Sequence, residues 1–125
     1  MNQELMFELE ELNGQSKDNE ERLKIVEQQI LELKSFESNL GELESNKNNE
    51  SLASLGKGVF IKADLKEEDL FVEVGSGILV KKSLGNSKKI AEQQTKKLVE
   101  MKNQLLSENE SISEKMKNAL EKIKH

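Results

Sequence analysis

The sequence predicts an α+β fold in which a long antiparallel two-helix coiled coil carries two central β-hairpins. Three observations support this prediction. Apolar residues recur at alternating steps of four and three residues in both outer parts of the chain. The centre is instead rich in β-branched residues and short apolar runs. Within it, the pattern apolar, Gly-x-Gly, three apolar residues and Lys occurs twice, at residues 55–62 and 74–81.

The length and composition favour one narrow domain. The 125 residues divide into a first helix at 1–49, two hairpins at 50–83 and a second helix at 84–125. Only 34% of the residues are hydrophobic and 3% aromatic, which is too little for a thick globular core. No Cys is present to form disulfides, and apolar runs of at most three residues are too short to span a membrane. The polar, acidic start does not resemble a signal peptide, so we expect a soluble cytoplasmic protein.

The net charge of −5 is distributed unevenly along the chain. Residues 1–50 carry a net charge of −8, whereas residues 85–125 carry +3. We expect an acidic helix and a basic helix to attract each other when they lie side by side, although two solvated faces with an accidental imbalance would give the same counts. The acidic total argues against a nucleic-acid-binding protein.

The first helix is predicted by a heptad pattern that no proline interrupts. Its seam, the row of residues that would face the second helix, consists of Leu5, Leu9, Leu12, Leu23, Val26, Ile30, Leu33 and Leu40. The same steps continue through the polar residues Ser16 and Asn19, and the polar run at 45–49 ends the helix. About 43 residues would make a rod on the order of 65 Å long, and a helix this polar needs a partner.

The second helix shows the same steps with more polar gaps. Its expected seam consists of Ile90, Leu98, Met101, Leu105, Ile112, Met116, Leu120 and Ile123. Ser83 or Ser87 is the candidate N-cap, because a hydroxyl there can accept a hydrogen bond from a free first-turn N–H. In an antiparallel register that places Leu23 opposite Leu105, Asn19 lies opposite Asn109. We expect these two asparagines to meet and to fix the register, as polar pairs in apolar seams do.

The centre is predicted to form two hairpins joined by a charged turn at residues 66–69. Residues 51–55 and 59–65 would pair in the first hairpin, and residues 70–74 and 78–81 in the second. Gly56, Gly58, Gly75 and Gly77 are the expected turn residues, because glycine reaches positive φ without a steric clash.

These hairpins have apolar side chains on both faces, and a two-stranded hairpin cannot bury both of them. We therefore expect an oligomerisation element. Its apolar residues are Val59, Phe60, Ile61, Phe71, Val72, Val74, Ile78, Leu79 and Val80.

Residues 55–63 and 71–80 carry a resemblance to a known family. Their strand–Gly-x-Gly–strand patterns, between two heptad helices, resemble a subunit of prefoldin, most closely the alpha type, which has two hairpins where the beta type has one. Ala53-Ser54 stands where alpha-type subunits often carry Val-Pro. The resemblance implies a hexamer of two alpha-type and four beta-type subunits, whose hairpins assemble into intersubunit β-barrels. It also implies an ATP-independent chaperone that holds unfolded polypeptides at its coiled-coil tips and transfers them to a group II chaperonin.

The helix ends contain more apolar residues than a single seam requires. Met6 and Phe7 lie off the seam, and flexible Met and exposed aromatic side chains suit contacts with varied unfolded chains. The predicted client-binding residues, called the tip residues below, are Leu5, Met6, Phe7, Leu9, Met116, Leu120 and Ile123. Ordinary seam packing with frayed ends is the alternative interpretation.

Other functional classes receive little support from the sequence. Both Gly-x-Gly units lead into strands, whereas a nucleotide-binding loop leads into a helix. His125 is the single histidine and has no Cys beside it, so we expect no metal and no cofactor. The many carboxylates fit a solvated helix face, and we expect no catalytic residues. A structural coiled-coil scaffold or tether without client-holding activity remains the main alternative, and a related subunit of another assembly is a second.

Overall fold

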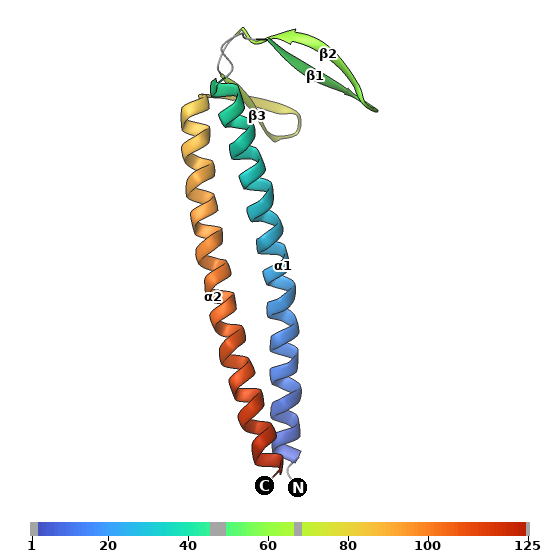
Figure 1. Cartoon of the computed structure of the whole chain (residues 1–125), viewed down its shortest axis with the longest axis vertical. Helices are drawn as coiled ribbons and strands as arrows, with labels where there is room; N and C mark the ends of the chain where they lie inside the picture. The colour runs from blue at the N-terminus through green and yellow to red at the C-terminus, as the bar shows by residue number, and fades with distance from the viewer. Residues whose placement is uncertain (1–2, 46–49, 67–68, 125) are drawn as a thin grey trace. The chain divides into compact units, whose positions relative to one another are not determined.

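The computed structural model describes residues 3–45, 50–66 and 69–124 of the chain (Figure 1). It contains two long helices and four strands, and it confirms the predicted α+β fold class. The elements in order are α1 (Gln3–Ser45), β1 (Glu50–Gly56), β2 (Val59–Asp64), β3 (Leu70–Gly75), β4 (Ile78–Lys82) and α2 (Leu84–Lys124).

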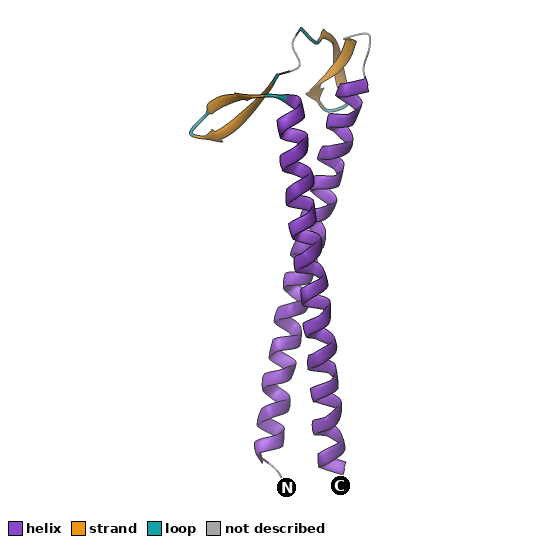
Figure 2. Ribbon diagram, turned by 90° about the vertical axis from the view of Figure 1, so that its left-hand side faces the viewer, coloured by secondary structure: helices purple, strands orange, loops and turns teal. Residues whose placement is uncertain are grey.

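The chain divides into two compact units. The helical unit contains Met1–Glu32 and Thr95–His125, and the hairpin unit contains Leu33–Gln94. In the helical unit, the parts of α1 and α2 run antiparallel, so that the first turns of α1 and the last turns of α2 lie at the same end (Figures 1 and 2).

Both helices are continuous for reasons that are local in the sequence. Gly14 and Gly41 lie inside α1, and no proline is present to break it. α2 begins at Leu84 because Ser83 acts as its N-cap: the Ser83 Oγ accepts a hydrogen bond from the Asn86 N–H at 3.1 Å. Of the two candidate caps, Ser83 is therefore the one used, and Ser87 lies buried inside the helix.

The core of the helical unit is a thin seam rather than a globular interior. Val26, Ile30 and Leu105 are buried together, and Leu23 and Leu98 pack against them. These five residues come from both helices, so they pack α1 against α2 in this unit. Since no large side chain in the described residues is completely buried, this unit is held by one layer of contacts.

The seam of α2 differs from the predicted one at several positions. Ile90, Met101 and Leu120 were expected to face α1, but they are exposed, and Ile123 is exposed near the end of the helix. The residues of α2 that are buried or half-buried are Leu84, Ser87, Lys88, Ala91, Thr95, Leu98, Lys102, Leu105, Asn109, Ile112, Met116 and Ala119. The prediction was wrong at Ile90, Met101 and Leu120 because each lies one residue away from the observed seam. The smaller or polar neighbours Ala91, Lys102 and Ala119 occupy the seam positions instead.

The hairpins form two separate two-stranded sheets, β1 with β2 and β3 with β4. Each sheet is antiparallel, and the last paired residues before the turns are Gly56 with Val59 and Gly75 with Ile78. The charged segment expected at residues 66–69 is described only at its two ends, where Asp69 forms an ion pair with Lys81 at 3.2 Å; residues 67–68 lie outside the described residues. Residues 46–49, expected to end the first helix, also lie outside them.

The repeated Gly-x-Gly pattern corresponds to a repeated turn. The two central residues of the first turn, Lys57 and Gly58, have φ values of 51° and 77°, and those of the second, Ser76 and Gly77, have 51° and 74°. Positive φ at both central positions is the geometry of a type I′ turn, whose twist matches that of the strands it joins. The pattern that occurs at residues 55–62 and 74–81 therefore encodes the same turn conformation twice.

Candidate functional site

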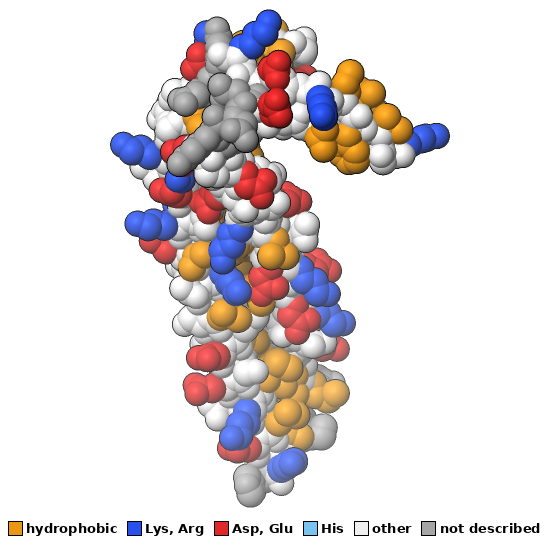
Figure 3. All heavy atoms as spheres, turned by 45° about the horizontal axis from the view of Figure 1, so that its top comes forward, with side chains coloured by type: hydrophobic (Ala, Val, Ile, Leu, Met, Phe, Trp, Pro, Cys, Tyr) orange, Lys and Arg blue, Asp and Glu red, His pale blue; other side chains and the backbone are white. Residues whose placement is uncertain are grey.

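The hairpin unit exposes the residues that the sequence analysis assigned to oligomerisation. Val59, Phe60 and Ile61 of β2 are each more than half exposed, at 54%, 58% and 55%. Val72 and Val80, which pair across β3 and β4, are the least exposed of the set at 38% each. The hydrophobic side chains of the hairpins are visible at the surface in Figure 3.

The exposure of neighbouring strand residues has a structural consequence. Successive side chains in a strand point to opposite faces, so the exposure of Val59, Phe60 and Ile61 in sequence leaves both faces of the first hairpin uncovered. The same holds for Ile78, Leu79 and Val80 in the second hairpin. Isolated two-stranded hairpins are at best marginally stable in water. The hairpins therefore present surfaces that another chain could cover.

The tip residues fall into two groups in the helical unit. Leu5, Leu9 and Met116 are half-buried along the seam. Met6 and Phe7 of α1 are exposed, at 56% and 66%, and so are Leu120 and Ile123 of α2, at 49% and 38%. Both pairs of exposed residues belong to the helix ends that lie together (Figure 1). This end of the unit therefore combines a closed seam with an exposed apolar surface.

Sequence reasoning missed further apolar residues that are exposed in the helical unit. Val99 and Leu106 on α2, and Ile25 and Leu31 on α1, are all at least 36% exposed. Each of them adjoins an apolar seam residue in the sequence, for example Leu106 after Leu105. Apolar doublets of this kind were the available signal, because a single seam uses only one residue of each doublet.

Asn19 and Asn109 both lie on the seam, but the hydrogen bond that Asn19 makes across the helices goes to Glu108. Asn19 is 7% exposed, and its Nδ2 donates a hydrogen bond to Glu108 Oε2 at 3.3 Å. The Asn109 Oδ1 is buried without a hydrogen-bond partner. A groove of about 340 Å³ is lined by Asn19 and Glu108 and, among others, by Arg22 and Lys115. The role of Asn19 and Asn109 in fixing the register stays a prediction.

We expect a chemical cross-link to report this register. With Asn19→Cys and Asn109→Cys, a short bis-maleimide should join the two thiols within one chain, because facing seam positions are the nearest inter-helix neighbours. The reaction is clean because the chain has no other Cys. Peptide mass spectrometry identifies the linked positions. Cross-linking of Asn19→Cys with Ile112→Cys in preference to the first pair would contradict the register.

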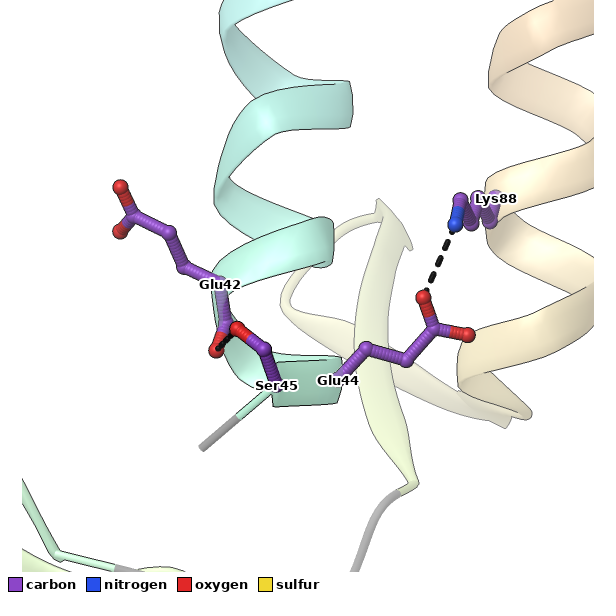
Figure 4. Close-up of polar contacts among 4 residues, drawn as sticks. All are labelled: Glu42, Glu44, Ser45 and Lys88. Atoms are coloured by element: carbon purple, nitrogen blue, oxygen red, sulfur yellow. Dashed lines mark hydrogen bonds and ion pairs between the residues drawn. The ribbon is translucent and has the colours of Figure 1, made fainter. Parts of the chain in front are cut away.

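Ion pairs between the acidic α1 and the basic α2 occur in both units of the described part of the chain. In the helical unit Lys102 lies 3.9 Å from Glu27, and in the hairpin unit the Lys88 Nζ lies 2.9 Å from Glu44 Oε2 (Figure 4). The pKa of Lys88 is raised above its ordinary value, because its ammonium group donates a hydrogen bond to Glu44 and is attracted by the charge of that carboxylate. Both pairs are partly exposed to solvent, so each contributes little to the free energy of unfolding.

The described residues contain neither a group of side chains placed to bind a metal ion nor a helix that could span a membrane. No group of three His, Cys, Asp or Glu residues is placed to hold a metal in residues 3–45, 50–66 and 69–124. Within the same residues, neither α1 nor α2 has the apolar length that a membrane-spanning helix requires. The expectation that the chain binds no cofactor and has no catalytic residues stays a prediction.

Comparisons with known proteins converge on one family. A family model described as "Prefoldin subunit" matches residues 8–125. The chain is 29% identical over 96 residues to prefoldin subunit alpha of Methanobrevibacter smithii, which covers 76% of this chain and 66% of that protein, slightly under two thirds of its length.

A solved structure agrees with the fold. The cryo-EM structure of filamentous PFD from Methanocaldococcus jannaschii matches with a TM-score of 0.70 over 90% of this chain and 95% of that one. The sequence identity is 16%, so this likeness concerns the fold alone.

Proposed function

Because this chain belongs to the prefoldin family, we propose that it is an alpha-type subunit of an ATP-independent molecular chaperone that holds unfolded polypeptides. The observation that carries the proposal is the exposure of Met6 and Phe7, two large apolar side chains that lie off the seam. Such exposed apolar surface on a helix end has no use within the chain itself. It suits binding of the apolar segments that an unfolded polypeptide presents.

The assembly proposed with this function is a hexamer of two alpha-type and four beta-type subunits. The uncovered faces of both hairpins support an assembly in which strands of several subunits close into β-barrels. Transfer of the held polypeptide to a group II chaperonin and a cytoplasmic location complete the proposal, and they rest on the family alone.

Holding of this kind requires no chemistry. Full burial of one large apolar side chain contributes about 1.5–3 kcal/mol, so the few exposed residues of one helical unit bind a client weakly. Several units in one assembly raise the overall affinity by multivalency, since each later contact is intramolecular. Weak individual contacts also allow a client to be released stepwise, without ATP hydrolysis.

The test is to remove the exposed side chains at the helix ends. Met6→Ser with Phe7→Ser should reduce the protection that the assembled complex gives to a denatured client, measured by light scattering during dilution from denaturant. Both residues are exposed, so we expect the helix content and the mass of the complex to stay unchanged. Those two quantities are measured by circular dichroism and native mass spectrometry.

A matched control separates a general loss of apolar surface from a loss at the helix ends. Ile25→Ser removes a side chain that is 59% exposed on the same helix, and it should leave protection unchanged. Full protection by the Met6 and Phe7 variant would contradict client binding at the helix ends and would favour a structural scaffold.

A further inference from the structure

The α2 part of the helical unit carries a second apolar row beside the seam. Val99, Leu106 and Leu120 are separated by seven and fourteen residues, and they are 36%, 42% and 49% exposed. Residues at multiples of seven lie along one face of a helix, so these three side chains form a line, called the outer row below. Ser113 occupies the remaining position of the same heptad series.

The outer row is not needed to hold α2 against α1. Each of its members directly follows a residue that already fills the seam, namely Leu98, Leu105 and Ala119. A two-helix coiled coil is closed by one seam, and a further exposed apolar row indicates contact with something outside the pair. The span from Val99 to Leu120 is about 31 Å at 1.5 Å per residue. An extended polypeptide of about nine residues covers that distance.

Lysines outnumber carboxylates among the α2 residues that lie three or four positions from the members of the outer row, while Glu100 and Glu121, which directly follow Val99 and Leu120, lie farther round the helix. The helical neighbours of its members, three or four residues away, include Lys96, Lys102, Lys117 and Lys124, and the one acidic residue among them is Glu110. Lys102 is paired with Glu27, whereas Lys96 and Lys117 are exposed. An occupant with carboxylates on either side of an aliphatic segment would therefore be complementary to this surface.

The size of the outer row argues against a second copy of the chain as its occupant. Stable protein interfaces bury about 800 Å² on each partner, which three partly exposed aliphatic side chains cannot supply. A short, weakly held peptide segment fits better. The row is also continuous with the helix end at which the proposed function places client binding, because Leu120 belongs to both.

We propose that the outer row is a second client-binding surface, which takes aliphatic segments of unfolded polypeptide that are flanked by carboxylates. This inference rests on the proposed chaperone function and extends its site from the helix ends along α2. A client would contact Leu120 first and then Leu106 and Val99, while the lysines attract its acidic flanks.

The test uses the full chain assembled with a beta-type partner and two fluorescent peptides. Both peptides carry the same Leu- and Val-rich core, one flanked by Asp and Glu and the other by Lys, and binding is measured by fluorescence anisotropy. The wild-type complex should bind the acidic-flanked peptide about tenfold more tightly at low ionic strength, and high salt should remove this preference. Val99→Ser with Leu106→Ser should weaken binding of that peptide about tenfold.

Two further variants make the result specific. Lys96→Glu with Lys117→Glu keeps the outer row and should reverse the preference between the peptides. Ile25→Ser is the matched control, since Ile25 is exposed in a separate recess that it lines with Met101 and Gln104, and this variant should bind like the wild type. Native mass spectrometry and circular dichroism verify that every variant is folded and assembled.

The outcomes separate this inference from the proposed function. A wild-type complex that binds neither peptide and protects no denatured client would overturn both. The inference alone is overturned if the wild type binds and depends on Met6 and Phe7 but is unaffected by the Val99 and Leu106 substitutions. Equal affinity for the two peptides, or an equal loss in Ile25→Ser, would also overturn it.

Discussion

A chain with Phe60→Asp and Leu79→Asp is expected to lose assembly with other prefoldin subunits completely. Each substitution places a carboxylate on an uncovered apolar face of one hairpin, and both side chains are about 60% exposed in the single chain. The chain alone should therefore still fold. In a subunit interface that covers these faces, however, an unpaired carboxylate costs several kcal/mol. Native mass spectrometry after co-expression with a beta-type partner measures the loss.

The control for this prediction is a carboxylate at a hairpin turn. Ser76 has a φ of 51°, a conformation that aspartate tolerates, and it lies outside the apolar faces. Ser76→Asp should therefore assemble like the wild type. A complex of full mass from the Phe60 and Leu79 variant would show that the hairpins do not form the interface.

The second large effect is expected on the free energy of unfolding of the helical unit, from a substitution of Leu105 in the apolar doublet Leu105-Leu106. Leu105 is 9% exposed and packs with Val26 and Ile30, whereas Leu106 is 42% exposed. Leu105→Ala should lower the free energy of unfolding by about 2–4 kcal/mol, because it leaves a cavity in a single-layer core. Leu106→Ala should change it by less than about 1 kcal/mol, since little packing is lost.

Urea unfolding followed by circular dichroism at 222 nm measures both variants. The thin seam makes the contrast large, because no second layer of side chains can take over the lost contacts of Leu105. Similar midpoints for the two variants would mean that the seam assignment on α2 is wrong. Such a result would also remove the distinction between the seam and the outer row.

The hairpins could be predicted closely because their signals are local. A turn with positive φ at two positions needs glycine or another residue that tolerates positive φ. The segments Gly56-Lys57-Gly58 and Gly75-Ser76-Gly77 indicate such turns in the sequence. The strands on either side then follow from short apolar runs between these turns. β1 begins one residue earlier and ends one residue later than residues 51–55.

The seam of α2 was harder to predict because its residues are not the most apolar ones nearby. Ala91 and Ala119 are buried, and Lys102 is half-buried beside the more apolar Met101. A close helix pair accepts small residues, and the aliphatic stem of a lysine can line the seam while its charge reaches solvent. Choosing the largest apolar residue in each turn therefore selected Met101 and Leu120, which face outward.

The prediction of the candidate site also required deciding which apolar residues belong to the seam and which lie outside it. Met6 and Phe7 stood out because neither fits the seam, and the structure places both in solvent. The seam predicted from the sequence contains Leu98 and Leu105 and leaves out Val99 and Leu106, and the structure shows that the latter two are exposed. The phase of the heptad repeat around Met101 and Leu120 comes from the structure, in which the seam positions are Lys102 and Ala119.

The uncovered faces of the hairpins have a consequence for the amount of this protein that a cell maintains. Before assembly, a newly made chain exposes aliphatic and aromatic side chains of the same kind as the segments that we propose it holds in other proteins. We therefore expect an unpartnered copy to be open to capture by chaperones or to proteolysis. We expect its steady-state level to follow that of its partner subunits, whatever the rate at which it is synthesised.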